Sequence, residues 1–148
     1  MYKNLLVPTD GSKLSMKAVT AALNLAQPLG AKITALHVVP PYAPPVYADA
    51  MVYVPELDPK EYKAATDAAA QKALAAVEKE AAKAGVACTA VHLVEGQPWE
   101  GILKAAKKHK CDAIVMASHG RRGLAGVLLG SETVKVLTHS KIPVLVCR

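Results

Sequence analysis

The sequence predicts an α/β fold built on a single open parallel sheet of five strands with helices on both faces. Five short apolar segments with strand character alternate along the chain with four segments of helical periodicity. Strands that alternate with helices form parallel sheets, because each helix carries the chain back across a face of the sheet. The segment Ala113–Ala117 is an unbroken apolar run, which is typical of a strand buried on both faces. A length of 148 residues fits one domain, residues 1–148.

The composition bounds the class of protein. Hydrophobic residues make up 52% of the chain, yet there is no Phe and only one Trp, so we expect a core of Val, Leu, Ile and Ala. No apolar run approaches the roughly 20 residues that span a bilayer, and the start of the chain lacks a signal-peptide pattern. Three cysteines without metal spacing indicate reduced thiols. We therefore expect a cytoplasmic protein with no membrane association.

The first half of the chain contains two predicted strands and one helix. We expect the first strand over Tyr2–Val7, where Pro8 stops its ladder. A helix follows from the N-cap Ser12 to Gly30, with an apolar stripe of Leu14, Ala18, Ala21, Ala22, Leu25 and Leu29. The second strand is Lys32–Val39.

Residues 40–59 form one long irregular segment that holds six of the ten prolines. A loop of this length in a compact domain is usually functional. A lid or partner surface and a disordered crossover are both compatible with its composition.

The second half of the chain continues the alternation. An alanine-rich helix is expected over Lys60–Ala84, with an inner face of Tyr62, Ala69, Ala73, Val77 and Ala81. A strand over Val86–Val94 is followed by a helix in which Trp99 anchors the packing. The last elements are the strand Ala113–Ala117, a helix from Gly130-Ser131 and the strand Pro143–Cys147.

The stretch after Ala117 has the pattern of an anion-binding loop. Ser118-His119-Gly120 ends the strand, and further glycines stand at 123 and 126 before Gly130-Ser131 opens a helix. A strand, a glycine-rich loop and a helix start present free backbone N–H groups to a phosphate. The sequence therefore predicts a phosphate site here.

The spacing within this loop carries a family resemblance. Nine residues separate Gly120 from Gly130-Ser131, and the stretch resembles the nucleotide-binding signature Gly-x-x-Gly, nine residues, Gly-Ser/Thr of the universal stress protein family. Ala117 stands where the signature has its first glycine. The resemblance covers nearly the whole chain, from Thr9-Asp10-Gly11-Ser12 to the closing segment Ile142–Cys147.

This resemblance implies a Rossmann-like sheet in the order 3-2-1-4-5 and an ATP-binding stress-response protein that acts as a binding or signalling module. Asp10 and Val38 would contact the base and ribose, and Gly120, Gly130 and Ser131 the phosphates. The full set of expected cofactor-binding residues is Pro8, Thr9, Asp10, Val38, Met116, Ala117, His119, Gly120, Arg121, Arg122, Gly130, Ser131, Glu132 and Thr133. Mg²⁺ or Mn²⁺ would bind through the phosphates without dedicated protein ligands. The family also pairs into homodimers through the C-terminal strand, here Pro143 to Cys147.

The charge distribution favours an anion near the glycine loop. The net charge is +6, and residues 101–148 hold nine Lys/Arg against two Asp/Glu. We expect this excess to lie around the loop, with Arg121 and Arg122 contacting the anion. The lysines between 104 and 110 fit a solvated helix face. Nucleic-acid binding is disfavoured, since no aromatic platform or reading motif is present.

The catalytic motifs of several enzyme classes are missing. There is no Gly-x-x-x-x-Gly-Lys-Ser/Thr, no Gly-x-Gly-x-x-Gly after the first strand, and no nucleophile elbow around Ser118. Without a catalytic acid or base near the loop, the sequence favours binding over turnover. Two alternatives remain open: a dimeric interaction module that binds no nucleotide, to which Ala117 points, and a slow ATPase.

Overall fold

The computed structural model describes residues 1–43, 58–120 and 129–148. Its strands form one parallel sheet in the order β3-β2-β1-β4-β5, which confirms the predicted topology. The elements are β1 (Asn4–Pro8), α1 (Lys13–Leu29), β2 (Lys32–Val39), α2 (Pro59–Ala84), β3 (Cys88–Val94), α3 (Pro98–Lys108), β4 (Ala113–Ala117), α4 (Ser131–His139) and β5 (Val144–Cys147). Arg121, Arg122 and most of the segment 40–59 lie outside the described residues.

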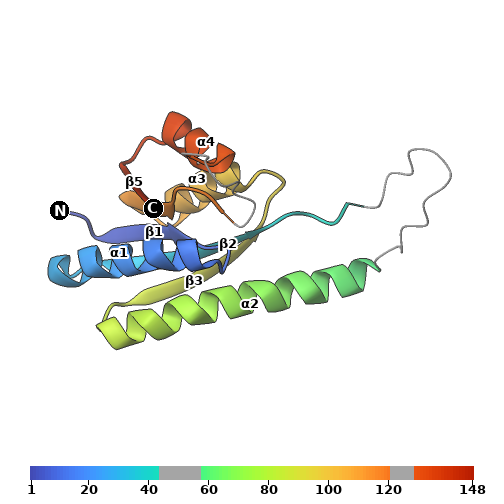
Figure 1. Cartoon of the computed structure of the whole chain (residues 1–148), viewed down its shortest axis with the longest axis horizontal. Helices are drawn as coiled ribbons and strands as arrows, with labels where there is room; N and C mark the ends of the chain where they lie inside the picture. The colour runs from blue at the N-terminus through green and yellow to red at the C-terminus, as the bar shows by residue number, and fades with distance from the viewer. Residues whose placement is uncertain (44–57, 121–128) are drawn as a thin grey trace.

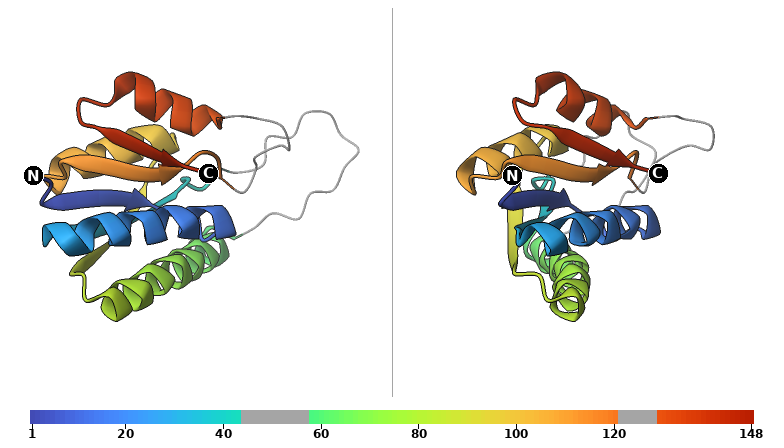
Figure 2. Two further views of the ribbon diagram at one scale, coloured as in Figure 1. Left: turned by 60° about the vertical axis from the view of Figure 1, so that its left-hand side comes forward. Right: turned by 90° about the vertical axis from the view of Figure 1, so that its left-hand side faces the viewer.

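The helices cover both faces of the sheet, as predicted. Figure 1 shows α1 and α2 on one face and α3 and α4 on the other, and the turned views of Figure 2 show the same layers. β1 lies at the centre, and its residues Leu5, Leu6 and Val7 are all 0% exposed. Leu5 and Val7 pack into the cluster under α1 and α2, while Leu6 packs into the cluster under α3 and α4. This two-sided burial explains the continuous apolar runs that the sequence carries at its central strands.

The register brings the carboxyl ends of three strands to one edge. Leu5 of β1 pairs with Ile33 of β2 and with Ala113 of β4. The chain leaves β1 toward β2 and β3 on one side, and β4 and β5 lie on the other side. The strand order therefore reverses between β1 and β4, and open α/β sheets bind their ligands at such a point.

The strand β1 begins two residues later than predicted and includes Pro8. Thr9 N–H donates to Leu36 O on β2 at 2.8 Å, so the nitrogen of the preceding Pro8 faces β4. Pairing between β1 and β4 extends only over Leu5 and Leu6. Pro8 therefore occupies a position where the missing N–H breaks no ladder hydrogen bond.

The inner face of α2 differs in part from the prediction. Ala73, Val77 and Ala81 are buried as expected, but Ala69 is exposed and Ala70 and Leu74 take the inner positions. The prediction that Ala69 belongs to the inner face was wrong because alanines occur on every side of this helix. Side chains of equal size and polarity leave little contrast from which to read the buried face.

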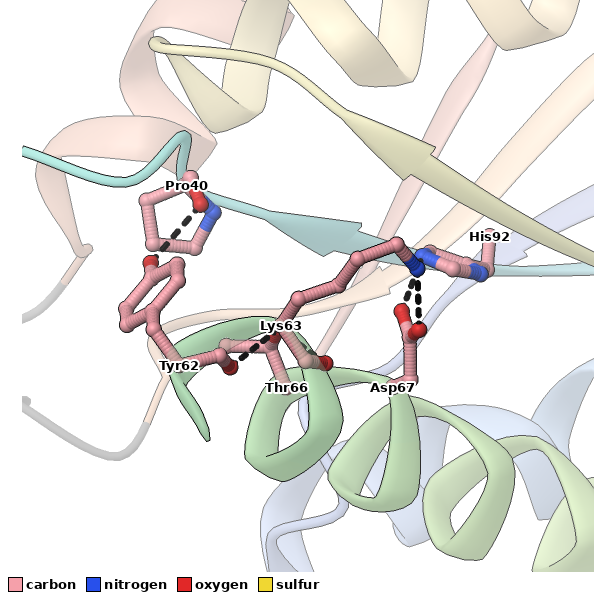
Figure 3. Close-up of polar contacts among 6 residues, drawn as sticks. All are labelled: Pro40, Tyr62, Lys63, Thr66, Asp67 and His92. Atoms are coloured by element: carbon pink, nitrogen blue, oxygen red, sulfur yellow. Dashed lines mark hydrogen bonds and ion pairs between the residues drawn. The ribbon is translucent and has the colours of Figure 1, made fainter. Parts of the chain in front are cut away.

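The start of α2 is fastened to the ends of two strands, as Figure 3 shows. Tyr62 Oη donates to Pro40 O at 2.8 Å, just past β2. One turn later, Asp67 Oδ1 lies 3.4 Å from His92 Nε2 of β3, and Lys63 also bonds to this carboxylate. The hydrogen bond from Lys63 lowers the pKa of Asp67, so the carboxylate stays charged. These exposed contacts orient the helix and contribute little free energy. None of the helices in the described ranges has the length and hydropathy to cross a membrane.

Candidate functional site

The loop after β1 is held by a network around Thr9. The buried Thr9 Oγ1 lies 3.0 Å from Ser15 Oγ and accepts the N–H of Gly11 at 3.1 Å. His37 Nδ1, at the end of β2, lies 2.9 Å from the carbonyl oxygen of Thr9. Gly11 has φ of 77°, a left-handed conformation that favours glycine. The loop therefore leaves the sheet in one defined direction.

The carboxylate of Asp10 lies directly over Gly120. Ser12 N–H donates to Asp10 Oδ1 at 2.9 Å, which fixes one oxygen. A Cβ added to Gly120 would lie 2.9 Å from the other oxygen, Asp10 Oδ2. Glycine at 120 thus leaves room for a side chain from a distant part of the sequence. The loops after β1 and β4 meet at the switch point of the sheet.

The amino end of α4 is folded back onto the end of β4. Gly130 N–H donates to Ser118 O at 2.7 Å, and the buried Thr133 Oγ1 donates to Ala117 O at 3.1 Å. A Cβ on Gly130 would lie 3.1 Å from both Cα and Cβ of His119. The φ of Gly130 is −70°, which any residue can adopt, so its backbone conformation does not call for glycine. The close approach to His119 does.

Among the described residues, no side chain caps the first turn of α4. Gly130 is the N-cap and makes no side-chain hydrogen bond, whereas Ser12 at the start of α1 accepts the N–H of Ser15. An uncapped helix start combines unsatisfied donors with the positive end of the helix dipole. This is an arrangement that binds phosphate.

The sequence matches known proteins over the whole chain. The profile of the universal stress protein family matches residues 1–148. The chain belongs to the universal stress protein family. The universal stress protein YxiE of Bacillus subtilis is 34% identical over 149 residues, covering 100% of each chain.

Solved structures agree with this assignment. The structure of hypothetical protein MJ0577 of Methanocaldococcus jannaschii has a TM-score of 0.81 and 28% identity, covering 99% of this chain and 96% of that one. A universal stress protein in complex with cAMP has a TM-score of 0.72 and 28% identity, covering 99% and 97%.

The predicted site residues fall into three groups. Thr9, Met116, Ala117 and Thr133 are buried. Pro8, Asp10, Val38, His119, Gly120, Gly130 and Ser131 are at least partly exposed at the ends of β1, β2 and β4 and at the start of α4. The carboxylate of Glu132 accepts the N–H of Trp99 and bonds to Lys135.

Ala117 departs from the family signature without backbone strain. In the part of the chain that the structure describes, Lys110 is the single non-glycine residue with positive φ. Ala117 is the last residue of β4 and pairs with Cys147. An alanine adopts this backbone conformation without strain. The replacement of the signature glycine by Ala117 is therefore weaker evidence against nucleotide binding.

The lysine-rich part of the excess charge does not surround the loop. Lys107 and Lys108 close α3, and Lys110 follows them at the end of the sheet where the strands begin. Asn4 Nδ2, at the start of β1, donates to His109 O at 3.0 Å and confirms this position. These lysines are exposed, as predicted for a solvated helix face. The expectation that the whole charge excess lies around the loop was wrong, because α3 ends at the opposite edge of the sheet.

Sequence reasoning named Thr9, Glu132 and Trp99 but missed the two sets of contacts in which they take part. The Thr9–Ser15–His37 contacts hold the loop after β1, and Trp99, Glu132 and His139 hold α4 against α3. Neither set follows a motif, since each joins residues from separate elements. Among the described residues, no group of three or more His, Cys, Asp or Glu side chains is arranged to hold a metal ion.

Gly120→Ala should destabilise the fold through Asp10. The new Cβ would lie 2.9 Å from Asp10 Oδ2, which Ser12 N–H holds in place. A double-mutant cycle with Asp10→Ala, measured by urea denaturation, should give a coupling of about 1 kcal/mol.

The matched control is Gly96→Ala, where an added Cβ meets no atom within 4 Å. It should leave the free energy of unfolding nearly unchanged or slightly raised. Strictly additive effects of Gly120→Ala and Asp10→Ala would show that the two loops do not meet in solution.

Proposed function

We propose that this chain is an ATP-binding stress-response protein and acts as a nucleotide-dependent binding or signalling module. The observation that carries the proposal is the meeting of Asp10 with Gly120 beside the uncapped start of α4. A carboxylate suited to hydroxyl donors and a helix end suited to phosphate thus lie at the same switch point. The related protein solved in complex with cAMP supports a nucleotide ligand for this fold.

The proposal gives each end of the ligand its own residues. Asp10 and Val38, with Pro8 and Thr9 beside them, would contact the ribose and base. The backbone of Gly120, Gly130 and Ser131 would bind the phosphates, with Met116, Ala117, His119 and Thr133 lining the same edge. Arg121 and Arg122 belong to the proposed phosphate contacts but lie outside the described residues.

A divalent cation would accompany the phosphates. Mg²⁺ and Mn²⁺ prefer oxygen ligands and keep much of their water, so phosphate oxygens suffice to hold them. The cation would neutralise phosphate charge beside the carboxylate of Asp10.

Slow or absent hydrolysis is part of the proposal. Fast phosphoryl transfer to water needs a group that positions the nucleophile and charge that strengthens in the transition state. His119 Nδ1 lies 3.1 Å from Ser118 Oγ, and this pair includes no carboxylate. A slow ATPase remains the third candidate, behind a dimeric module without nucleotide.

The proposal takes residues 1–148 as one domain in the cytoplasm. Cys88, Cys111 and Cys147 are free thiols, which suits a reducing compartment. Burial raises the pKa of all three thiols, so they stay protonated and unreactive near neutral pH.

Ser131→Ala should weaken ATP binding about tenfold without unfolding the protein. Ser131 is exposed at the first position of α4, where its hydroxyl can meet a phosphate. Titration calorimetry with ATP, AMP and cAMP measures the affinities, and a melting curve for each variant measures stability.

Thr138→Ala is the control, because it removes a hydroxyl from the exposed far end of the same helix. It should bind ATP as the wild type does. Preference of the wild type for cAMP would replace ATP by a cyclic nucleotide, and no heat with any of the three would favour the interaction module. Gly130→Val is a poor test, since its Cβ presses on His119 within the protein.

We also propose that the protein forms a homodimer through the C-terminal strand, Pro143 to Cys147. β5 is an outer strand of the sheet, and its Leu145 is 47% exposed. On the neighbouring α4, Val134 is 45% and Leu137 is 41% exposed. An apolar sheet edge of this kind favours pairing with a second copy.

Leu145→Lys should convert the dimer to a monomer. The variant places an ammonium group in the proposed interface, whereas Val144 and Val146 pack against the core and would unfold it if charged. Light scattering should give about twice the 15.5 kDa chain mass for the wild type and half that value for the variant. Val94→Lys, at a 57% exposed position on the opposite outer strand, should remain a dimer. A monomeric wild type, or loss of the dimer in Val94→Lys alone, would contradict the proposed interface.

A further inference from the structure

The first turn of α3 touches both ends of the proposed nucleotide site. Trp99 N–H donates to Glu132 Oε2 of α4 at 2.9 Å. Two residues later, Gly101 packs so closely on Val38 of β2 that an added Cβ would lie 3.1 Å from Val38 Cγ2. Glu132 directly follows Ser131 at the start of α4. One helical turn therefore spans the distance between the phosphate end and the base end of the site.

Glu132 has both carboxylate oxygens engaged. Oε2 accepts from Trp99, and Oε1 lies 3.1 Å from Lys135 Nζ. The positive end of the α3 dipole and the ammonium of Lys135 balance its charge. A free carboxylate in the first turn of α4 would repel phosphate at the same helix end. The contacts with α3 and Lys135 hold the carboxylate of Glu132 against these groups. The backbone N–H groups of the first turn of α4 would then be left to the proposed ligand.

The side chain of Trp99 contacts the carboxyl end of α4. Its ring lies 4.6 Å from the ring of His139, with 36° between the planes. The indole also packs against the hydrophobic cluster under α3 and α4. Trp99 thus contacts the first turn of α4 through its backbone and the last turn through its side chain. This residue fixes α4 against α3.

We propose that Glu132 is a positioning residue of the nucleotide site. By binding Trp99 N–H, it fixes the distance from the amino end of α4 to Val38, so that one ligand engages both ends at once. The inference rests on the proposed nucleotide binding and gives Glu132 an indirect role in place of the direct contact expected from the family resemblance. A residue in this role affects ligands that reach both ends of the site more than ligands that reach one.

The test compares ATP with adenosine, which lacks phosphates. In Glu132→Ala, the affinity for ATP should fall about five- to tenfold, a loss within the range of one ordinary hydrogen bond, while adenosine binding changes less than about twofold. Glu132→Gln should keep most of the ATP affinity, because its amide oxygen accepts the same N–H. Displacement of a fluorescent ATP analogue measures both ligands.

Trp99 provides a second readout, since it is the single tryptophan of the chain. Its fluorescence should change in ligand-free Glu132→Ala and stay as in the wild type in Glu132→Gln. Glu100→Ala is the matched control: it removes a carboxylate from the same turn of α3 that lies 3.8 Å from Lys104 of its own helix. That variant should alter neither the fluorescence nor the ATP affinity.

Three outcomes overturn the positioning role. Equal losses for ATP and adenosine indicate general destabilisation, which melting curves would register. Unchanged ATP affinity in Glu132→Ala shows that the distance is fixed without this residue. A Glu132→Gln variant as weak as Glu132→Ala shows that the charge itself meets the ligand. A wild type that binds neither ligand would overturn the proposed function instead, and the positioning role with it.

Discussion

The structure depends on the burial of β1 at the centre of the sheet. Leu5, Leu6 and Val7 are 0% exposed and alternate between the two hydrophobic clusters, so a single strand joins both halves of the core. A shift of one residue would exchange these faces and place Leu6 against the wrong helices. The register is therefore fixed by packing. It brings Thr9 and Asp10 to the edge where β4 also ends.

The site follows from this register through short-range contacts. Asp10 meets Gly120 because the loops after β1 and β4 leave adjacent strands at the same edge. The bonds from Gly130 and Thr133 to the end of β4 turn the start of α4 toward that edge. Loops would carry the proposed ligand contacts, and the sheet positions the loops.

Alternation of strands and helices, together with the family resemblance, predicted the fold correctly, down to the strand order and the bounds of β4. The sequence pattern failed to identify the buried face of α2 at Ala69, where neighbouring residues are alike. It also ended β1 before Pro8, although that position needs no N–H. The sum of charges over residues 101–148 did not locate the excess, because charge counted along the chain does not record which edge of the sheet a helix end reaches.

The candidate site was predictable only as far as its motif extends. The spacing of Gly120, Gly130 and Ser131 located the loop, but the reason for both glycines differed from the expected one. Gly120 leaves room for Asp10, and Gly130 leaves room for His119. Contacts between distant elements, such as Glu132 with Trp99, have no local pattern and emerge only from the packed structure.

The central claim is that an adenine nucleotide binds where β1 and β4 part. Titration of the ¹⁵N-labelled protein with ATP and Mg²⁺, followed by amide chemical shifts, locates the ligand most directly. We expect the largest changes at Asp10, Val38, Gly120 and the first turn of α4, with little change at the amino ends of the strands. Shifts confined to α2 or to the opposite edge of the sheet, or no shifts at millimolar ATP, would contradict the account.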